Sequence, residues 1–129
     1  MNERVFVLDA SAVLAFLQGE PGALRVEEIL PISLISAVNL AEVVTKMTEF
    51  GISDADIVAQ IDPLELEVDP FDRTLALRAG AMRAATRHLG LSLGDRACLA
   101  TAATVGRVAV TADKAWAKLD LGIPVELLR

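Results

Sequence analysis

The sequence is poor in the residues on which several kinds of functional site depend. It contains one cysteine, Cys98, and one histidine, His88, among 129 residues. A single cysteine excludes an internal disulfide and a multi-cysteine zinc site, and a Ser-His or Cys-His nucleophile would depend on His88 alone. Four phenylalanines, one tryptophan and no tyrosine also argue against an RNA-binding surface that stacks bases on aromatic side chains.

Long apolar runs and glycine-rich phosphate loops are lacking as well. No run reaches the roughly 18 apolar residues that a membrane span requires. The apolar run after Arg4 is interrupted by Asp9 and is followed by no small-residue cleavage site, so it does not fit a signal peptide. We therefore expect a cytoplasmic protein with no membrane contact. No Gly-x-Gly-x-x-Gly or Walker-type motif follows a predicted strand, so dinucleotide and P-loop nucleotide binding are unsupported.

The composition fits one compact domain with a real core. Hydrophobic residues make up 53% of the chain and charged residues 23%, and a chain of this size can bury a core without disulfides. The formal net charge is −6. A nucleic-acid partner would therefore have to be attracted by a local basic patch, a bound cation, or both.

Short apolar runs alternate with longer helical patterns along the chain. We expect strands at 5–8, 32–35, 64–68, 107–110 and 124–128, and helices at 10–17, 23–30, 37–50, 55–61, 73–88, 94–104 and around Trp116. Ser36, Asp72 and either Ser53 or Asp54 are the expected N-caps, and Gly51 and Gly90 end their helices. Strands separated by helices imply right-handed crossovers. The predicted fold is a three-layer α/β/α domain with a mostly parallel sheet of four to five strands.

Four acidic residues lie near predicted strand ends or helix starts. Asp9 follows the first strand, Asp113 follows the fourth, Glu42 lies in the helix after the second, and Asp95 opens a later helix. Sites in such sheets lie beyond the carboxyl ends of the strands. Carboxylates gathered there would repel one another unless a divalent cation such as Mg²⁺ or Mn²⁺ were bound. The pattern therefore predicts a site for a hard cation.

Each acid also has an ordinary structural explanation. Asp9 and Asp113 suit N-caps, and Asp95 suits the positive end of a helix dipole. Glu42 belongs to a polar stripe at helical spacing, together with Asn39, Lys46 and Glu49. The occurrence of acids at successive strand ends, rather than any one acid, favours a functional site.

Four motifs follow one another along the chain: VLDASAVLA at 7–15, NLAE at 39–42, GLSLGDRACLATA at 90–102 and VTADKAW at 110–116. In these motifs the chain resembles the PIN domain family, and more closely the VapC-type ribonuclease toxins of type II toxin–antitoxin systems. The resemblance covers nearly the whole chain, so 1–129 is expected to be a single PIN domain. The Asn-x-x-Glu element alone is nonspecific, whereas the order and spacing of all four are specific.

The resemblance implies an activity and the residues that perform it. The acidic metal-binding residues of the family correspond to Asp9, Glu42, Asp95 and Asp113, and its supporting polar residues to Ser11, Asn39 and Thr111. The implied activity is Mg²⁺- or Mn²⁺-dependent endoribonuclease cleavage of RNA by metal-activated water. We expect Asp9 and Asp113 to ligate the metal directly and Asp95 directly or through water. Glu42 would act through water or orient the attacking water. The implied partner is a small VapB-like antitoxin.

Basic residues offer candidate contacts to the RNA backbone. Arg73, Arg83 and Arg87 fall within an arc of about 80° if 73–88 is one helix, and they form either a phosphate-binding strip or a solvated face. Arg96 either neutralises Asp95 or meets the RNA. Lys114 is near the site by position or is an ordinary surface lysine.

Several other features leave alternatives open. The apolar residues Val13, Leu14, Phe16 and Leu17 pack in the core or face a second copy in a homodimer, the assembly that we expect. Trp116 and Cys98 are expected in the core. A non-catalytic PIN-like binding or scaffold module would use the acids only as caps. A phosphotransfer receiver domain would need an acid pair after the first strand, where only Asp9 stands, and a phosphate-accepting residue such as Asp69 after the third.

Overall fold

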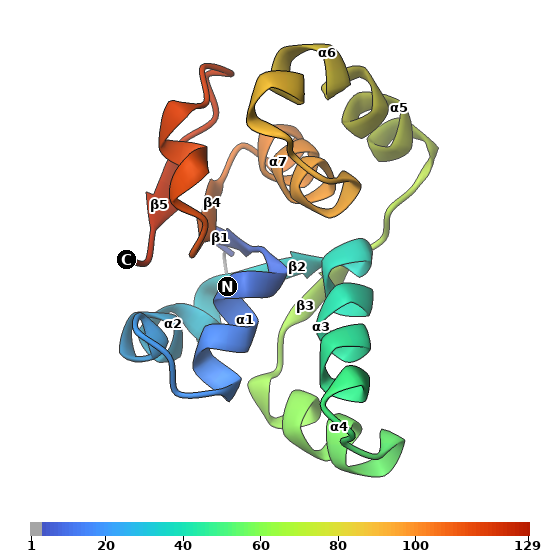
Figure 1. Cartoon of the computed structure of the whole chain (residues 1–129), viewed down its shortest axis with the longest axis vertical. Helices are drawn as coiled ribbons and strands as arrows, with labels where there is room; N and C mark the ends of the chain where they lie inside the picture. The colour runs from blue at the N-terminus through green and yellow to red at the C-terminus, as the bar shows by residue number, and fades with distance from the viewer. Residues whose placement is uncertain (1–3) are drawn as a thin grey trace.

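The computed structural model describes residues 4–129 and is organised around one parallel sheet (Figure 1). Its five strands have the order β3-β2-β1-β4-β5, and every neighbouring pair is parallel. The strands are β1 (Phe6–Leu8), β2 (Ser33–Ser36), β3 (Glu67–Asp69), β4 (Val108–Thr111) and β5 (Val125–Leu127). The predicted parallel α/β architecture is confirmed.

Helices cover both faces of the sheet. On one side lie α1 (Ala10–Leu17), α2 (Ala23–Ile29), α3 (Ala37–Glu49) and α4 (Asp54–Ile61), and on the other lie α5 (Arg73–Ala81), α6 (Arg83–Thr86) and α7 (Leu93–Val105) (Figure 1). Short 3-10 turns complete the chain: η1 (Leu30–Ile32), η2 (Asp62–Leu64), η3 (Arg87–Leu89) and η4 (Lys114–Lys118). The three-layer arrangement is the predicted one.

Alternation along β1 explains how two cores form. Leu8 belongs to the cluster with Val43 on the α1–α4 side, whereas Val7 belongs to the cluster with Leu99 on the α7 side. Successive side chains of a strand point to opposite faces, so the apolar run at 5–8 feeds both layers.

The strand order locates the point where a site is expected. The chain moves from β1 to β2 on one side and places β4 on the other side of β1. The carboxyl ends of β1 and β4 therefore flank a topological switch point, where ligands bind in open α/β sheets. A receiver domain has the order 2-1-3-4-5, so the phosphotransfer alternative does not fit this topology.

Most predicted helix ends are confirmed. The Ser36 hydroxyl accepts from the Val38 amide at 3.2 Å, the Ser53 hydroxyl from the Asp56 amide at 3.2 Å, and the Asp72 carboxylate from the Leu75 amide at 3.0 Å. Helix α7 starts one residue earlier than expected, at Leu93, because Ser92 is its N-cap.

The prediction of a strand at 64–68 is only partly right. Residues 62–64 form η2, which has Pro63 near its start, and Glu65 has a positive φ of 50°. This turn delays β3 until Glu67. The strand lies at the edge of the sheet.

The prediction of one continuous helix over 73–88 is wrong. Helix α5 ends at Ala81, and Met82 separates it from α6. Arg96 of α7 donates through Nη1 to the Ala79 carbonyl oxygen at 3.0 Å, which is the acceptor that the Arg83 amide would use in an uninterrupted α-helix. The arc calculated for the arginines on a single helix therefore does not hold.

The expected core residues are buried. Trp116 is 1% exposed, and Cys98 is fully buried. Val13 is buried as well, and the other apolar residues of α1 pack partly buried against the same cluster: Leu14, Phe16 and Leu17. The core explanation for this helix is thus sufficient, and the homodimer stays a prediction. Within residues 4–129, no helix combines the length and apolar character needed to cross a membrane.

Candidate active site between strands β1 and β4

Asp9 lies at the carboxyl end of β1 and caps α1. Its backbone amide donates to the Val110 carbonyl of β4 at 3.0 Å. Its carboxylate accepts from the Ala12 amide at 2.9 Å, the Ser11 hydroxyl at 2.7 Å and the Thr111 hydroxyl at 2.5 Å. Burial raises the pKa of Asp9 to about 6, and the bonds from Thr111, Ser11 and Ala12 oppose the rise. The N-cap explanation is correct, but it does not explain an acid that is only 4% exposed.

The hydroxyls of Ser11 and Thr111 join the two strand ends. Their oxygens lie 3.3 Å apart, and both donate to Asp9. They also accept from the turn after β4: Ser11 from the Ala112 amide at 2.9 Å, and Thr111 from the Asp113 amide at 3.0 Å. The two hydroxyls therefore hold the β4 turn onto the Asp9 carboxylate.

Asp113 belongs to this turn, but its carboxylate is exposed and caps η4. Its Oδ1 accepts from the Ala115 amide at 2.9 Å. The charge of Asp113 is also not among the causes that shift the pKa of Asp9. The structure thus places Asp113 next to the site through its backbone, with its carboxylate turned towards the cap.

Glu42 reaches the site from the second turn of α3. Asn39, one turn earlier and 1% exposed, donates through Nδ2 to Glu42 Oε1 at 2.8 Å and to the Gly94 carbonyl oxygen at 3.0 Å. The Asn39 amide therefore links α3 to the first turn of α7. Burial raises the pKa of Glu42, the Asn39 bond opposes this, and the negative charge of Asp95 adds to it.

Asp95 completes the group from α7. It forms a capping box with Ser92: the Asp95 amide donates to the Ser92 hydroxyl at 3.1 Å, and the Ser92 amide donates to Asp95 Oδ2 at 2.9 Å. Its charge also raises the pKa values of Asp9 and Glu42. Asp95 is therefore both a helix cap and a member of the acidic group.

The thiol of Cys98 is affected by the same three acids. Burial raises the pKa of its thiol, and the charges of Asp9, Asp95 and Glu42 raise it further, in that order. Three carboxylates from three different elements thus act on one buried thiol. The charges of three of the four predicted acids, Asp9, Glu42 and Asp95, thus act on the same buried region.

The donor chemistry of the group fits a hard divalent cation. The carboxylates of Asp9 and Glu42 have raised pKa values, so a nearby positive charge would favour their ionised forms. Asn39 Oδ1 is buried and has no hydrogen-bond partner. Over residues 4–129, however, no three acidic, histidine or cysteine side chains are near enough to enclose an ion by themselves. Water would have to complete the coordination, as is usual for Mg²⁺.

The basic candidates lie outside this group. Arg96 donates to α5, and no ion pair in the described part of the chain joins it to Asp95. Its Nε is buried without a hydrogen-bond partner. Lys114, Arg83 and Arg87 are exposed.

Sequence analysis did not single out Gly94 as part of the site. A Cβ atom on this residue would lie 2.1 Å from Glu42 Oε2. The only signal in the sequence is a glycine at the second position of a helix otherwise rich in alanine and leucine.

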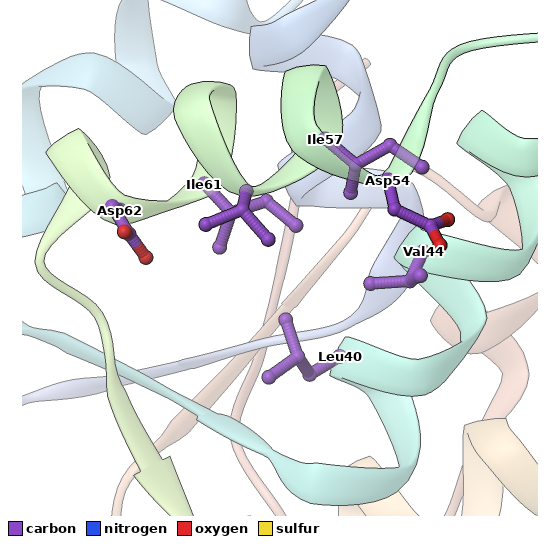
Figure 2. Close-up of a pocket in the computed structure, with 7 residues that line it drawn as sticks. Leu40, Val44, Asp54, Ile57, Ile61 and Asp62 are labelled. Carbon is purple, nitrogen blue, oxygen red and sulfur yellow. The ribbon is translucent and has the colours of Figure 1, made fainter.

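Two hollows adjoin α3. An apolar hollow of about 360 Å³ lies between α3 and α4, where Leu40 and Val44 face Ile57 and Ile61 (Figure 2). An open groove of about 490 Å³ lies between α1 and α3, with Glu42 in its wall beside Ala10 and Leu14. Of the acidic group, Glu42 therefore adjoins an open groove rather than a closed pocket.

Comparison with known proteins agrees with this architecture. A PIN domain family model matches residues 6–121. Among solved structures, the DNA-bound VapBC complex from Salmonella typhimurium contains a chain with a TM-score of 0.75 and 21% identity, over 98% of this chain and 99% of that chain. A chain of VapBC2 from Rickettsia felis bound to a promoter DNA fragment has a TM-score of 0.72 and 17% identity, over 96% of this chain and 98% of that chain. A chain of VapBC-5 from Mycobacterium tuberculosis has a TM-score of 0.59 and 26% identity, over 95% of this chain and 96% of that chain.

These structural matches extend over nearly the full length of both chains and establish the fold. No curated protein matches. The family model spans β1, β4 and all four predicted acids. The resemblance found in the sequence is thereby confirmed, and the chain belongs to the PIN domain family.

Proposed function

We propose that this protein is an endoribonuclease that depends on Mg²⁺ or Mn²⁺. The observation that carries the proposal is the burial of Asp9 at the switch point between β1 and β4, with its pKa raised to about 6 and with the charge of Asp95 acting on both Asp9 and Glu42. Acids held together at such an energetic disadvantage are typical of functional sites.

Each acid has a proposed role in the chemistry. Asp9 would hold the cation, with Asp95 bound to it directly or through water, and Asp113 would reach it by turning from its cap on η4. Glu42 would reach the cation through water or orient the water that attacks the phosphate. When bound, the cation would lower the pKa of the attacking water and neutralise charge on the phosphate. Ser11 and Thr111 fix the Asp9 carboxylate by hydrogen bonds. In the hydrolysis, the water oxygen bonds to phosphorus, the bond to the departing sugar oxygen breaks, and the water proton is transferred to that oxygen.

We further propose that the protein is the VapC-type toxin of a toxin–antitoxin pair. Its support is the full-length likeness to chains of complexes described as VapBC from Salmonella typhimurium and Rickettsia felis. The expected partner is a small VapB-like antitoxin that blocks the acidic groove.

The decisive experiment incubates partner-free protein with end-labelled total RNA, in Mg²⁺ or Mn²⁺ and in EDTA. Wild type is compared with Asp95→Asn. The matched control is Asp56→Asn, because Asp56 stands at the same position after a serine N-cap, in α4. We expect discrete fragments from wild type and Asp56→Asn in metal only, and none from Asp95→Asn. Cleavage by a folded Asp95→Asn variant would refute the assignment.

One observation favours a second candidate, a non-catalytic binding or scaffold module. Asp9, Asp95 and Asp113 all act as helix caps, and this role needs no metal. A ligand that binds only the folded state raises the melting temperature. The scaffold candidate therefore predicts equal melting temperatures with and without Mn²⁺, whereas the nuclease candidate predicts a rise that Asp9→Asn abolishes.

A further inference from the structure

We propose that Gly94 is a positioning residue for the Glu42 carboxylate. Its functional consequence rests on the nuclease proposal, whereas its structural content does not. A Cβ atom at Gly94 would lie 2.1 Å from Glu42 Oε2 and 2.3 Å from both Cδ and Oε1. The carboxylate of α3 thus occupies the space that any side chain at position 94 would need.

The backbone does not require glycine at this position. Gly94 is the second residue of α7 and is not among the glycines with positive φ. Glycine is less favourable than alanine inside a helix. The close approach of Glu42 is therefore the physical reason for a glycine here.

Asn39 holds the carboxylate in this place. Its Nδ2 donates both to Glu42 Oε1 at 2.8 Å and to the Gly94 carbonyl at 3.0 Å. The reversed amide orientation would set an oxygen against both acceptors, so the network has one favourable arrangement. The contact positions Glu42 on the first turn of α7, where the charge of Asp95 raises its pKa.

A side chain at position 94 would displace Glu42 more readily than it would unfold the protein. The atoms in its way are the end of a flexible side chain, and Glu42 is only half-buried. The carboxylate would swing out and lose its bond to Asn39. Gly94→Ala is therefore expected to keep the fold and to lose the position of one acid.

The test compares Gly94→Ala with Gly80→Ala. Gly80 is also a glycine inside a helix, and a Cβ there meets nothing within 4 Å. Three quantities are measured. They are the NMR signals of the Asn39 side-chain amide, the rate of RNA cleavage, and the Mn²⁺ midpoint, which is the Mn²⁺ concentration that gives half of the maximal rise in melting temperature. We expect Gly94→Ala to shift the Asn39 signals, to raise the Mn²⁺ midpoint several-fold and to reduce cleavage about tenfold or more. Gly80→Ala should change none of them.

A double-mutant cycle with Glu42→Asp distinguishes an effect of Gly94→Ala that acts through the Glu42 carboxylate from a disturbance of the fold that does not. The aspartate carboxylate is one methylene shorter and leaves the space above Gly94. Adding Gly94→Ala to Glu42→Asp should therefore have little further effect on the Mn²⁺ midpoint and on cleavage. Additive effects, an unfolded Gly94→Ala variant, or unchanged Asn39 signals would each overturn the inference. If wild type cleaves no RNA, the nuclease proposal fails, and the Asn39 signals still decide the role of Gly94.

Discussion

At the scale of single residues, burial and hydrogen bonding have opposite effects on the pKa of Asp9. Three hydrogen bonds stabilise its ionised form, yet burial outweighs them and raises its pKa to about 6. Without a cation, the ionised carboxylate therefore destabilises the folded state at neutral pH.

The first prediction concerns the pH dependence caused by Asp9. Its pKa is 3.8 when unperturbed and about 6 in the fold, so its stabilising contribution is full below pH 3.8 and is lost as pH rises through 6. The loss is about 3 kcal/mol at most. In metal-free urea unfolding, the free energy of unfolding of Asp9→Asn relative to wild type should therefore increase between pH 4 and pH 7. A constant difference across this range would contradict the burial argument.

The second prediction concerns Thr111, which donates to Asp9 and accepts from Asp113. Thr111→Val keeps the shape and removes both bonds. We expect a loss of about 1–3 kcal/mol in the free energy of unfolding at pH 7, together with weaker Mn²⁺ binding in a melting titration. The matched control is Thr101→Val, because Thr101 is equally buried and its hydroxyl donates only to the Ala97 carbonyl of its own helix. Equal Mn²⁺ midpoints in the two variants would show that Thr111 does not hold the site.

At the scale of secondary-structure elements, the break between α5 and α6 coincides with a contact from another helix. Arg96 supplies a charged donor to the Ala79 carbonyl, while Leu75 and Ala79 bury against α7. The residue after the site acid Asp95 thus also shapes the α5–α6 layer. A mutation at Arg96 is therefore expected to change the packing of the α5–α6 layer more than the arrangement of the acids.

The third prediction follows from that contact. Arg96→Met keeps an apolar stem and removes the donor, and we expect it to destabilise the 79–90 segment by about 1–2 kcal/mol. Hydrogen exchange should accelerate in peptides covering 79–90 and stay unchanged in β1 and β4. The control is Arg83→Met, on an exposed arginine of the same layer. Equal exchange in both variants would remove Arg96 as the cause of the break.

Features of the fold that follow from local sequence patterns differ in predictability from those that follow from contacts between distant residues. Strands, N-caps and the acids at strand ends follow from local patterns, so they could be predicted. The break at Met82 and the position of Glu42 against Gly94 coincide with contacts between residues far apart in the sequence, which no periodicity reveals. For Asp113 the sequence left the cap and the metal-ligand explanations open, because a cap and a metal ligand have the same local sequence.

At the scale of the whole molecule, charge is separated along the chain. Residues 49–72 contain eight acidic and no basic residues, whereas 73–94 contain four arginines, one histidine and no acid. The four arginines are exposed: Arg73, Arg78, Arg83 and Arg87. Across the described residues, none of them forms an ion pair. An acidic protein thus carries a local basic layer beside the helix that bears Asp95.

The fourth prediction assigns this basic layer to RNA phosphates. The affinity for one fluorescent single-stranded RNA is measured in EDTA, so that the RNA is bound without being cleaved. Arg87→Gln should weaken binding and reduce the slope of log affinity against log salt by about 0.7, the value for one phosphate contact on a single strand. Arg129→Gln, which removes the same charge near the C-terminal end of β5, should leave the slope unchanged. Equal slopes would identify the arginines as a solvated face.

The edges of the sheet have a consequence for association between copies. Strand β3 has only three residues, and its central Val68 stands between Glu67 and Asp69. At the other edge, Arg25 engages the Glu126 carboxylate of β5 through two nitrogens, at 2.8 and 3.0 Å. Two copies that approached edge to edge at β3 would bring the like charges of Glu67 and Asp69 together. At β5, which is equally short, the Arg25–Glu126 ion pair places charged groups beside the edge strand. Open strands of this kind resist the backbone pairing through which sheets grow into aggregates.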